Sequence, residues 1–238
     1  MKKIIFKLAL FLLTFLFLTR GLGISKISAQ NVGTQATIEP ILTFTITGLK
    51  NGTNITTRNP NCLGADITNP GSGNDATSTY VNLGTFKNGV INISAQELTV
   101  STNISSGYSL TATSSGKFIN TTAGAFIADA NGGNGLTAND TPSPALFPAS
   151  GNEAFGIHSC GEDINSNLWG NVATGFNSGA KYINPWNNGS NNYYSSIASY
   201  NAAASARKTI VEYAGTISPN TPAGTYNTQF TFVITVNF

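Results

Sequence analysis

The sequence predicts an all-β protein, an antiparallel β-sandwich with long Asn/Gly-rich loops. Charged residues make up only 9% of the 238 residues, and Asn, Thr, Ser and Gly supply the polarity instead. Apolar side chains recur at every second position in several short segments, and Asn/Gly turn signals separate these segments. The aromatic content of 10% argues against a disordered chain. Together these features favour a sandwich over helical folds.

The first strand is expected within residues 36–49. Leu42, Phe44 and Ile46 alternate there with polar residues, and Pro40 favours an edge position or a strand start. Residues 50–77 are rich in Asn, Thr, Pro and Gly and are expected to form a long loop around Cys62.

Alternation predicts further strands before residue 129. A short strand at 80–86 is followed by Asn88-Gly89, a strong hairpin signal. The extended segment 90–104 and its neighbour 108–113 flank a Ser-Ser-Gly turn. One more strand is expected within 117–128.

The stretch from 129 to 206 is Gly/Asn/Ser-rich, and we interpret it as a loop-rich insertion in a single domain spanning residues 30–238. Within it only Glu153–His158 has a strand pattern, and Ser196–Arg207 is expected to form one or two helical turns. Strand alternation returns at Thr209–Ile217.

The chain ends on its most regular segment, which predicts a half-buried final strand. Its inward side chains are Phe230, Phe232, Ile234, Val236 and Phe238. Such a strand completes the core of its own domain or is donated between subunits.

The N-terminus has the anatomy of a secretory signal peptide. Three lysines precede an apolar run at Leu8–Leu18, and Ile27-Ser28-Ala29 supplies a small residue at the cleavage position. We therefore expect residues 1–29 to be removed and the protein to be secreted, extracellular or at the cell surface. An uncleaved N-terminal anchor is the alternative. No second apolar stretch is long enough for a membrane span after signal cleavage.

The charge balance depends on this leader. Five of the 12 Lys and Arg residues lie within residues 1–29, which leaves seven basic against ten acidic residues, a net charge of −3. The mature chain therefore offers no argument for nucleic acid as a partner.

Catalytic, cofactor and metal sites are not predicted. The single histidine, His158, lies two residues from Cys160, but metal binding or nucleophilic catalysis would need further ligands or an oriented base. Asp163–Asn167 has the spacing of a calcium loop but lacks its Gly and its terminal Glu. We expect no enzyme activity.

Two cysteines in an exported chain most simply form one disulfide, Cys62–Cys160. Two free thiols and intermolecular pairing are the alternatives. A bond would join the loop after the first strand to the middle of the chain.

The aromatic tract between 169 and 200 is the best candidate for ligand recognition. Aromatic faces can stack on sugar rings, and neighbouring Asn amides supply hydrogen bonds without charge. The candidate glycan-binding residues are Trp169, Tyr182, Trp186, Tyr193 and Tyr194. Alternatively, these rings simply cover the core of the sandwich.

Three short motifs carry a resemblance to known proteins. Leu83-Gly84-Thr85-Phe86, Ser106-Gly107-Tyr108 and Ala223-Gly224-Thr225-Tyr226 resemble the core signature of a group of secreted bacterial β-sandwich proteins. Their order is similar to that in the spore coat protein U family of pilin-like subunits.

This resemblance implies an Ig-like Greek-key sandwich in a coat, surface layer or fibre, with adhesion to cell-surface components or to other copies of itself. Thr99–Asn103 lacks the cysteine that the pilin-like family carries before its hairpin. We expect a secreted structural or adhesive surface protein, and a glycan-binding module is the alternative.

Overall fold

The computed structural model describes residues 35–62, 65–130, 145–146, 152–170, 180–186 and 194–237. Residues 35–39 form no regular element, and the other described residues belong to one compact unit, Pro40–Phe238. The regular structure of this unit is almost entirely strand, in antiparallel sheets. The predicted all-β sandwich is therefore confirmed.

One sheet has four strands in the order β1-β2-β10-β7. Their bounds are Leu42–Gly48, Asn92–Thr102, Ala204–Thr216 and Ala154–Gly161. Every pairing in it is antiparallel, and β10 pairs with β2 along nearly its whole length and with β7 over Thr209–Thr216.

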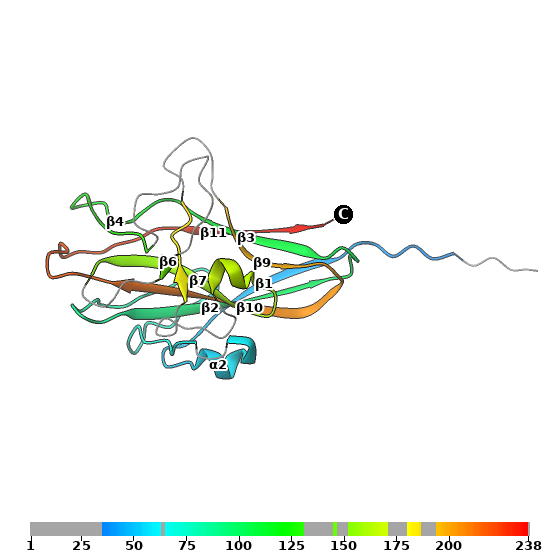
Figure 1. Ribbon diagram of the computed structural model, residues 1–238, viewed down its shortest axis with the longest axis horizontal. Coiled ribbons are helices and arrows are strands. Elements are labelled where there is room, and N and C mark those ends of the chain that lie inside the picture. The colour runs from blue at the N-terminus through cyan, green and yellow to red at the C-terminus, as the bar shows by residue number, and fades with distance from the viewer. Residues whose placement is uncertain are drawn as a thin grey trace, which may run out of the picture. The chain divides into compact units, whose positions relative to one another are not determined.

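The second sheet has three strands in the order β11-β3-β9. Their bounds are Phe230–Val236, Tyr108–Ser114 and Ser195–Tyr200. Among the seven strands of the two sheets, taken in chain order, the chain changes sheets at every step after β2, as the crossed connections of a Greek-key sandwich do. Figure 1 shows the two sheets as layers, with β11, β3 and β9 over the four-stranded sheet.

Short elements complete the described chain. They are helices α2 (Ile55–Arg58), η1 (Pro60–Cys62) and α3 (Ser166–Trp169), the strand pair β4 (Phe118–Asn120) and β5 (Ala125–Ile127), and the pair β6 (Ala145–Leu146) and β8 (Lys181–Tyr182). Asn54 caps α2 by accepting a hydrogen bond from the Thr57 backbone N–H.

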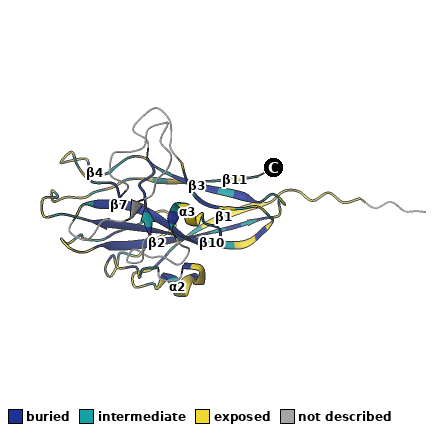
Figure 2. Cartoon of the chain, in the orientation of Figure 1, coloured by how far each residue is buried: buried dark blue, intermediate teal, exposed yellow. Residues whose placement is uncertain are grey.

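The main core lies between the two sheets. Leu98 and Val211 of the four-stranded sheet face Leu110 and Ile197 of the other, and all four are at most 1% exposed. The outer face of the four-stranded sheet is also covered, because Ile55 and Cys62 pack on Ala95 and Ile210. Figure 2 shows the resulting burial of β2, β7 and β10, in contrast to the exposed surface of α2.

The strand expected at 80–86 is wrong, although the turn at Asn88-Gly89 is present. Gly84 adopts the left-handed backbone conformation, with φ +71°, which interrupts an extended strand. The side-chain amide of Asn92 donates to the carbonyls of Leu83 and Thr85, at 2.7 and 3.2 Å. Side-chain hydrogen bonds thus replace ladder pairing in this segment.

The helical turn expected at Ser196–Arg207 is also wrong. The segment forms β9, a turn and the start of β10. Ile197 and Ala198 are buried in the core while β9 pairs with β3, so tertiary packing overrides the helix propensity of an Ala-rich run.

Two other expectations change in detail. The single strand expected within 117–128 is the hairpin of β4 and β5. The stretch 129–206, interpreted as a loop-rich insertion, contributes β7 and β9 to the two sheets of the sandwich. The final strand is confirmed over Phe230–Val236, whereas Phe238 lies outside the described residues.

Candidate functional site

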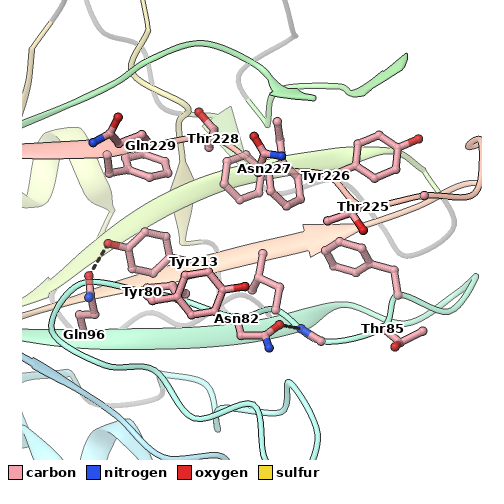
Figure 3. A pocket seen from close by; sticks show the side chains of 18 of the residues that line it. Tyr80, Asn82, Thr85, Gln96, Tyr213, Thr225, Tyr226, Asn227, Thr228 and Gln229 are labelled. Atoms are coloured by element: carbon pink, nitrogen blue, oxygen red, sulfur yellow. Dashed lines mark hydrogen bonds between the residues drawn. The ribbon is translucent and has the colours of Figure 1, made fainter. Parts of the chain in front are cut away.

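A cleft of about 1000 Å³ opens between the two sheets on the side of β1 and β11. Ile46 of β1 and Phe230 and Phe232 of β11 line it, so the edge strands of both sheets border the cleft. Figure 3 shows its two walls, with Thr225–Gln229 on one side and Tyr80, Asn82 and Thr85 on the other. Its volume lies at the upper end of the usual range for ligand pockets.

Aromatic rings form much of the inner surface. Phe118 stacks on Phe155 with ring centroids 4.2 Å apart, and it also contacts Phe86 at 6.3 Å and Tyr226 at 6.1 Å. All four rings line the cleft. An occupant would therefore bury apolar surface against rings that are already held in place by one another.

A polar pair lies on the floor, between the strands β2 and β10. The Tyr213 hydroxyl donates to Gln96 Oε1 at 2.7 Å, and Gln96 Nε2 donates to the Thr77 carbonyl at 2.6 Å. Both side chains are 4% exposed. Burial raises the pKa of Tyr213 above its ordinary value, so its hydroxyl stays protonated and remains a donor.

The wall formed by residues 78–86 has no regular secondary structure and packs closely against the backbone at Pro70. A Cβ on Gly84 would lie 1.9 Å from the Pro70 carbonyl oxygen, so only glycine fits there. Asn82 accepts from the Gly84 N–H at 2.8 Å and donates to Asn74 at 2.6 Å. The segment is thus held by side chains and by a close backbone approach.

The opposite wall, residues 221–232, leads directly into β11. Asn227 exchanges backbone hydrogen bonds with Ile119, both at 3.0 Å, and Thr228 Oγ1 donates to the Gly116 carbonyl at 3.0 Å. These bonds tie the wall to the β4 region. The side-chain amide of Gln229 and the hydroxyl of Thr225 make no hydrogen bond within the described part of the chain.

None of the described residues that line the cleft has a charged side chain. The lining combines phenyl rings and aliphatic groups with hydroxyls and amides. A charged group entering such a site would lose hydration without gaining an ion pair. The cleft is therefore suited to an uncharged occupant.

The strand β11 is an unpaired edge beside this cleft. It pairs with β3 on one side, and no described strand pairs with its other side. Its inward side chains Phe230, Phe232 and Ile234 pack on the core yet stay only partly buried. This is the position that one more strand of the three-stranded sheet would occupy.

The candidate glycan-binding aromatics do not form an exposed surface. Trp169 and Tyr182 are fully buried and Trp186 is 8% exposed. Their polar atoms bond internally: Trp169 Nε1 to the Ser196 carbonyl (2.8 Å), Trp186 Nε1 to Asp129 Oδ2 (2.6 Å) and the Tyr182 hydroxyl to Glu212 Oε2 (2.8 Å). A sugar could not stack on these rings, so this prediction is corrected: the three rings cover the core. Tyr194 is 43% exposed, and Tyr193 lies outside the described residues.

The expected disulfide is present. Cys62 and Cys160 are bonded across 98 residues, and both are fully buried. The bond joins η1 to β7 beneath the outer face of the four-stranded sheet. His158, two residues earlier, is fully buried with Nδ1 3.0 Å from the Lys181 carbonyl, so it lies in the interior of the protein.

Sequence reasoning missed the cleft residues. Two of the motifs that carry the family resemblance, Leu83–Phe86 and Ala223–Tyr226, lie on opposite walls of the cleft. Nothing in their local pattern indicates that they face each other. In the described part of the chain no helix has the length and apolarity of a membrane span, and no group of three potential metal ligands occurs. No protein-family model, curated protein or solved structure matches this chain.

Proposed function

We propose that the protein is a secreted, non-catalytic structural subunit of a coat or fibre at the cell surface, and that its cleft accepts a strand from a neighbouring copy. One observation carries the proposal: no described strand pairs with the outer side of β11, and this edge lies next to a cleft of about 1000 Å³ with an aromatic lining. A strand added there gains backbone hydrogen bonds from the edge and buries its apolar side chains in the cleft.

The geometry favours a strand that pairs on one side only. The β11 edge offers a row of backbone groups over Phe230–Val236, and the first three residues of this strand also line the cleft. The opposite wall offers no such row, since the Leu83 and Thr85 carbonyls already accept hydrogen bonds from Asn92. Side chains pointing into the cleft would therefore supply most of the specificity.

The first residues of the mature chain fit this role. Residues 30–41 read QNVGTQATIEPI, and the compact unit begins only at Pro40. In an extended strand one face carries Val32, Thr34, Ala36 and Ile38, and the other carries Glu39. Because the cleft has no charged lining, the face without Glu39 is the one that would enter it.

A pair of matched substitutions tests the proposal. Ile38 is 83% exposed, so Ile38→Asp leaves the fold of the subunit intact while adding a charge to the inward face of the donated strand. Thr37→Asp adds the same charge to the opposite face. In native gels and size-exclusion chromatography the mature chain should form ordered oligomers that Ile38→Asp abolishes and Thr37→Asp retains.

Two results would overturn the proposal. One is a mature chain that stays monomeric at high concentration, and the other is oligomers that both substitutions weaken equally. Equal weakening would mean that the copies contact each other through another surface, or that any added negative charge weakens the oligomers.

Neutral glycan binding in the same cleft is the second candidate function. It is favoured by the uncharged lining of aromatic, amide and hydroxyl side chains, with Tyr80 63% exposed at the wall. Retention of the Ile38→Asp monomer on a neutral polysaccharide resin, lost in Tyr80→Ala but kept in Tyr194→Ala, would support this candidate. No retention on dextran, mannan or laminarin would reject it.

A further inference from the structure

We propose that the Gln96–Tyr213 pair on the floor of the cleft selects a hydrogen-bonding side chain at one position of the inserted strand, and that Thr34 of a second copy provides it. This inference rests on the proposed function, because it assigns a partner to one residue pair within the same cleft. It predicts that the entering strand is not recognised by apolar burial alone.

The pair has hydrogen-bonding capacity left after its internal contacts. Tyr213 uses its one proton on Gln96 Oε1, and Gln96 uses one amide proton on the Thr77 carbonyl. A side-chain amide has two donor hydrogens and an acceptor oxygen with two lone pairs, and a phenol oxygen also accepts. One amide proton and several lone pairs therefore remain on a floor that is otherwise apolar.

An inserted strand would exclude water from these atoms. Both side chains are already 96% buried, and the strand would cover what is still exposed. An apolar side chain placed above them would leave the remaining groups unsatisfied, whereas a hydroxyl could donate to and accept from them. Sites that hydrogen-bond a hydroxyl discriminate against analogues that lack it.

Thr34 is the one polar side chain on the inward face between Val32 and Ile38. The other inward side chains are Val32, Ala36 and Ile38, which suit the aromatic and aliphatic lining. In an inserted extended strand Thr37 would lie on the opposite face. The chain thus offers two threonines of identical chemistry, of which only one would meet the floor.

Synthetic peptides of residues 30–41 provide the test. Each is labelled with a fluorophore and titrated by anisotropy into the mature Ile38→Asp variant, whose own segment does not fill the cleft. The Thr34→Val peptide should bind about tenfold more weakly than the unmodified peptide, whereas Thr37→Val should stay within about twofold. Valine keeps the shape of threonine and removes only the hydrogen-bonding group.

Removing the Tyr213 hydroxyl should abolish the difference in affinity between the unmodified and the Thr34→Val peptides. Tyr213→Phe keeps the ring, which packs 5.4 Å from Phe230, and removes the hydroxyl. In that variant the Thr34 and Thr34→Val peptides should bind within about twofold of each other. A melting temperature near that of the parent would show that the variant is folded.

The outcomes separate the two proposals. If the unmodified peptide binds but Thr34→Val binds equally well, the selection by Gln96 and Tyr213 is wrong and the strand-accepting function stands. If no peptide binds, both proposals fail. If Thr37→Val is the weaker peptide, the opposite face enters the cleft and Thr34 is not the partner.

Discussion

At the scale of single residues, Glu212 is the most unusual side chain in the described structure. It lies fully buried on the outer face of the four-stranded sheet, directly across from His158 in the β10–β7 pairing. Tyr182 donates to its Oε2 at 2.8 Å, and the rings of Tyr182 and His158 are 5.2 Å apart. Burial, reinforced by the charge of nearby Asp66, raises the pKa of Glu212 to about 8.

This pKa shift makes stability depend on pH. The unfolded chain releases the Glu212 proton above about pH 4.5, while the folded protein keeps it until about pH 8. The contribution of the protonated Glu212 to the free energy of unfolding is thus fully present below pH 4.5. It is lost as the pH rises to 8, at about 1.4 kcal/mol per pH unit.

Glu212→Gln should therefore flatten the fall in stability between pH 5 and pH 8, because the amide cannot ionise. Urea unfolding at a series of pH values measures this slope. An unchanged slope in the variant would show that the carboxyl is not held protonated in the folded protein.

At the scale of elements, the disulfide attaches helices α2 and η1 to the outer face of the four-stranded sheet. Helices α2 and η1 carry few buried side chains, chiefly Ile55 and Cys62. Arg58 of α2 also forms a two-pronged ion pair with Glu97 of β2, both contacts at 2.7 Å. These two helices are therefore attached to the sheet by a covalent bond, an ion pair, a small apolar contact and a hydrogen bond from Asn59 Nδ2 to the Lys208 carbonyl at 3.0 Å.

Replacing both cysteines by alanine should lower the free energy of unfolding by about 2–5 kcal/mol, because the bond closes a loop of 98 residues. Urea denaturation gives the loss, and far-ultraviolet circular dichroism should show retained strands, since neither sheet depends on the bond for its pairing. An unchanged unfolding midpoint would contradict this structural role.

At the scale of the whole molecule, β11 completes the core between the sheets, and no described strand pairs with its outer edge. Phe230 contacts the rings of Phe155 and Tyr213, at 6.0 and 5.4 Å. Burying a large apolar side chain contributes roughly 1.5–3 kcal/mol, and a typical domain has a net stability of about 5–15 kcal/mol. The strand is thus an essential part of its own domain.

Deleting residues 225–238 should give an aggregating chain, because β3 would lose one of its two partner strands and expose unpaired backbone groups. Solubility, together with the loss of a cooperative thermal transition, measures the effect. Adding the 225–238 peptide during refolding should restore soluble protein. A truncated chain that unfolds cooperatively would show that the segment is dispensable.

The sequence by itself determined the strands whose pattern repeats locally and the disulfide. Alternation at Leu42–Ile46 and at Phe230–Ile234 distinguishes an apolar from a polar face within a few residues, so β1 and β11 could be predicted. With two cysteines in a chain expected to be exported, a single disulfide between Cys62 and Cys160 is the simplest prediction.

Only the tertiary structure decided where side chains distant in sequence meet. The sequence predicts Trp186 as a ligand-binding residue. In the structure its indole N–H instead donates to Asp129, 57 residues away in sequence, in the core. Ser196–Arg207 has helical propensity, yet pairing with β3 makes it strand. The cleft depends on contacts such as Tyr213 to Gln96, 117 residues apart. Local pattern records which side chains are buried, but not which partner buries them, because that depends on how the two sheets close on each other.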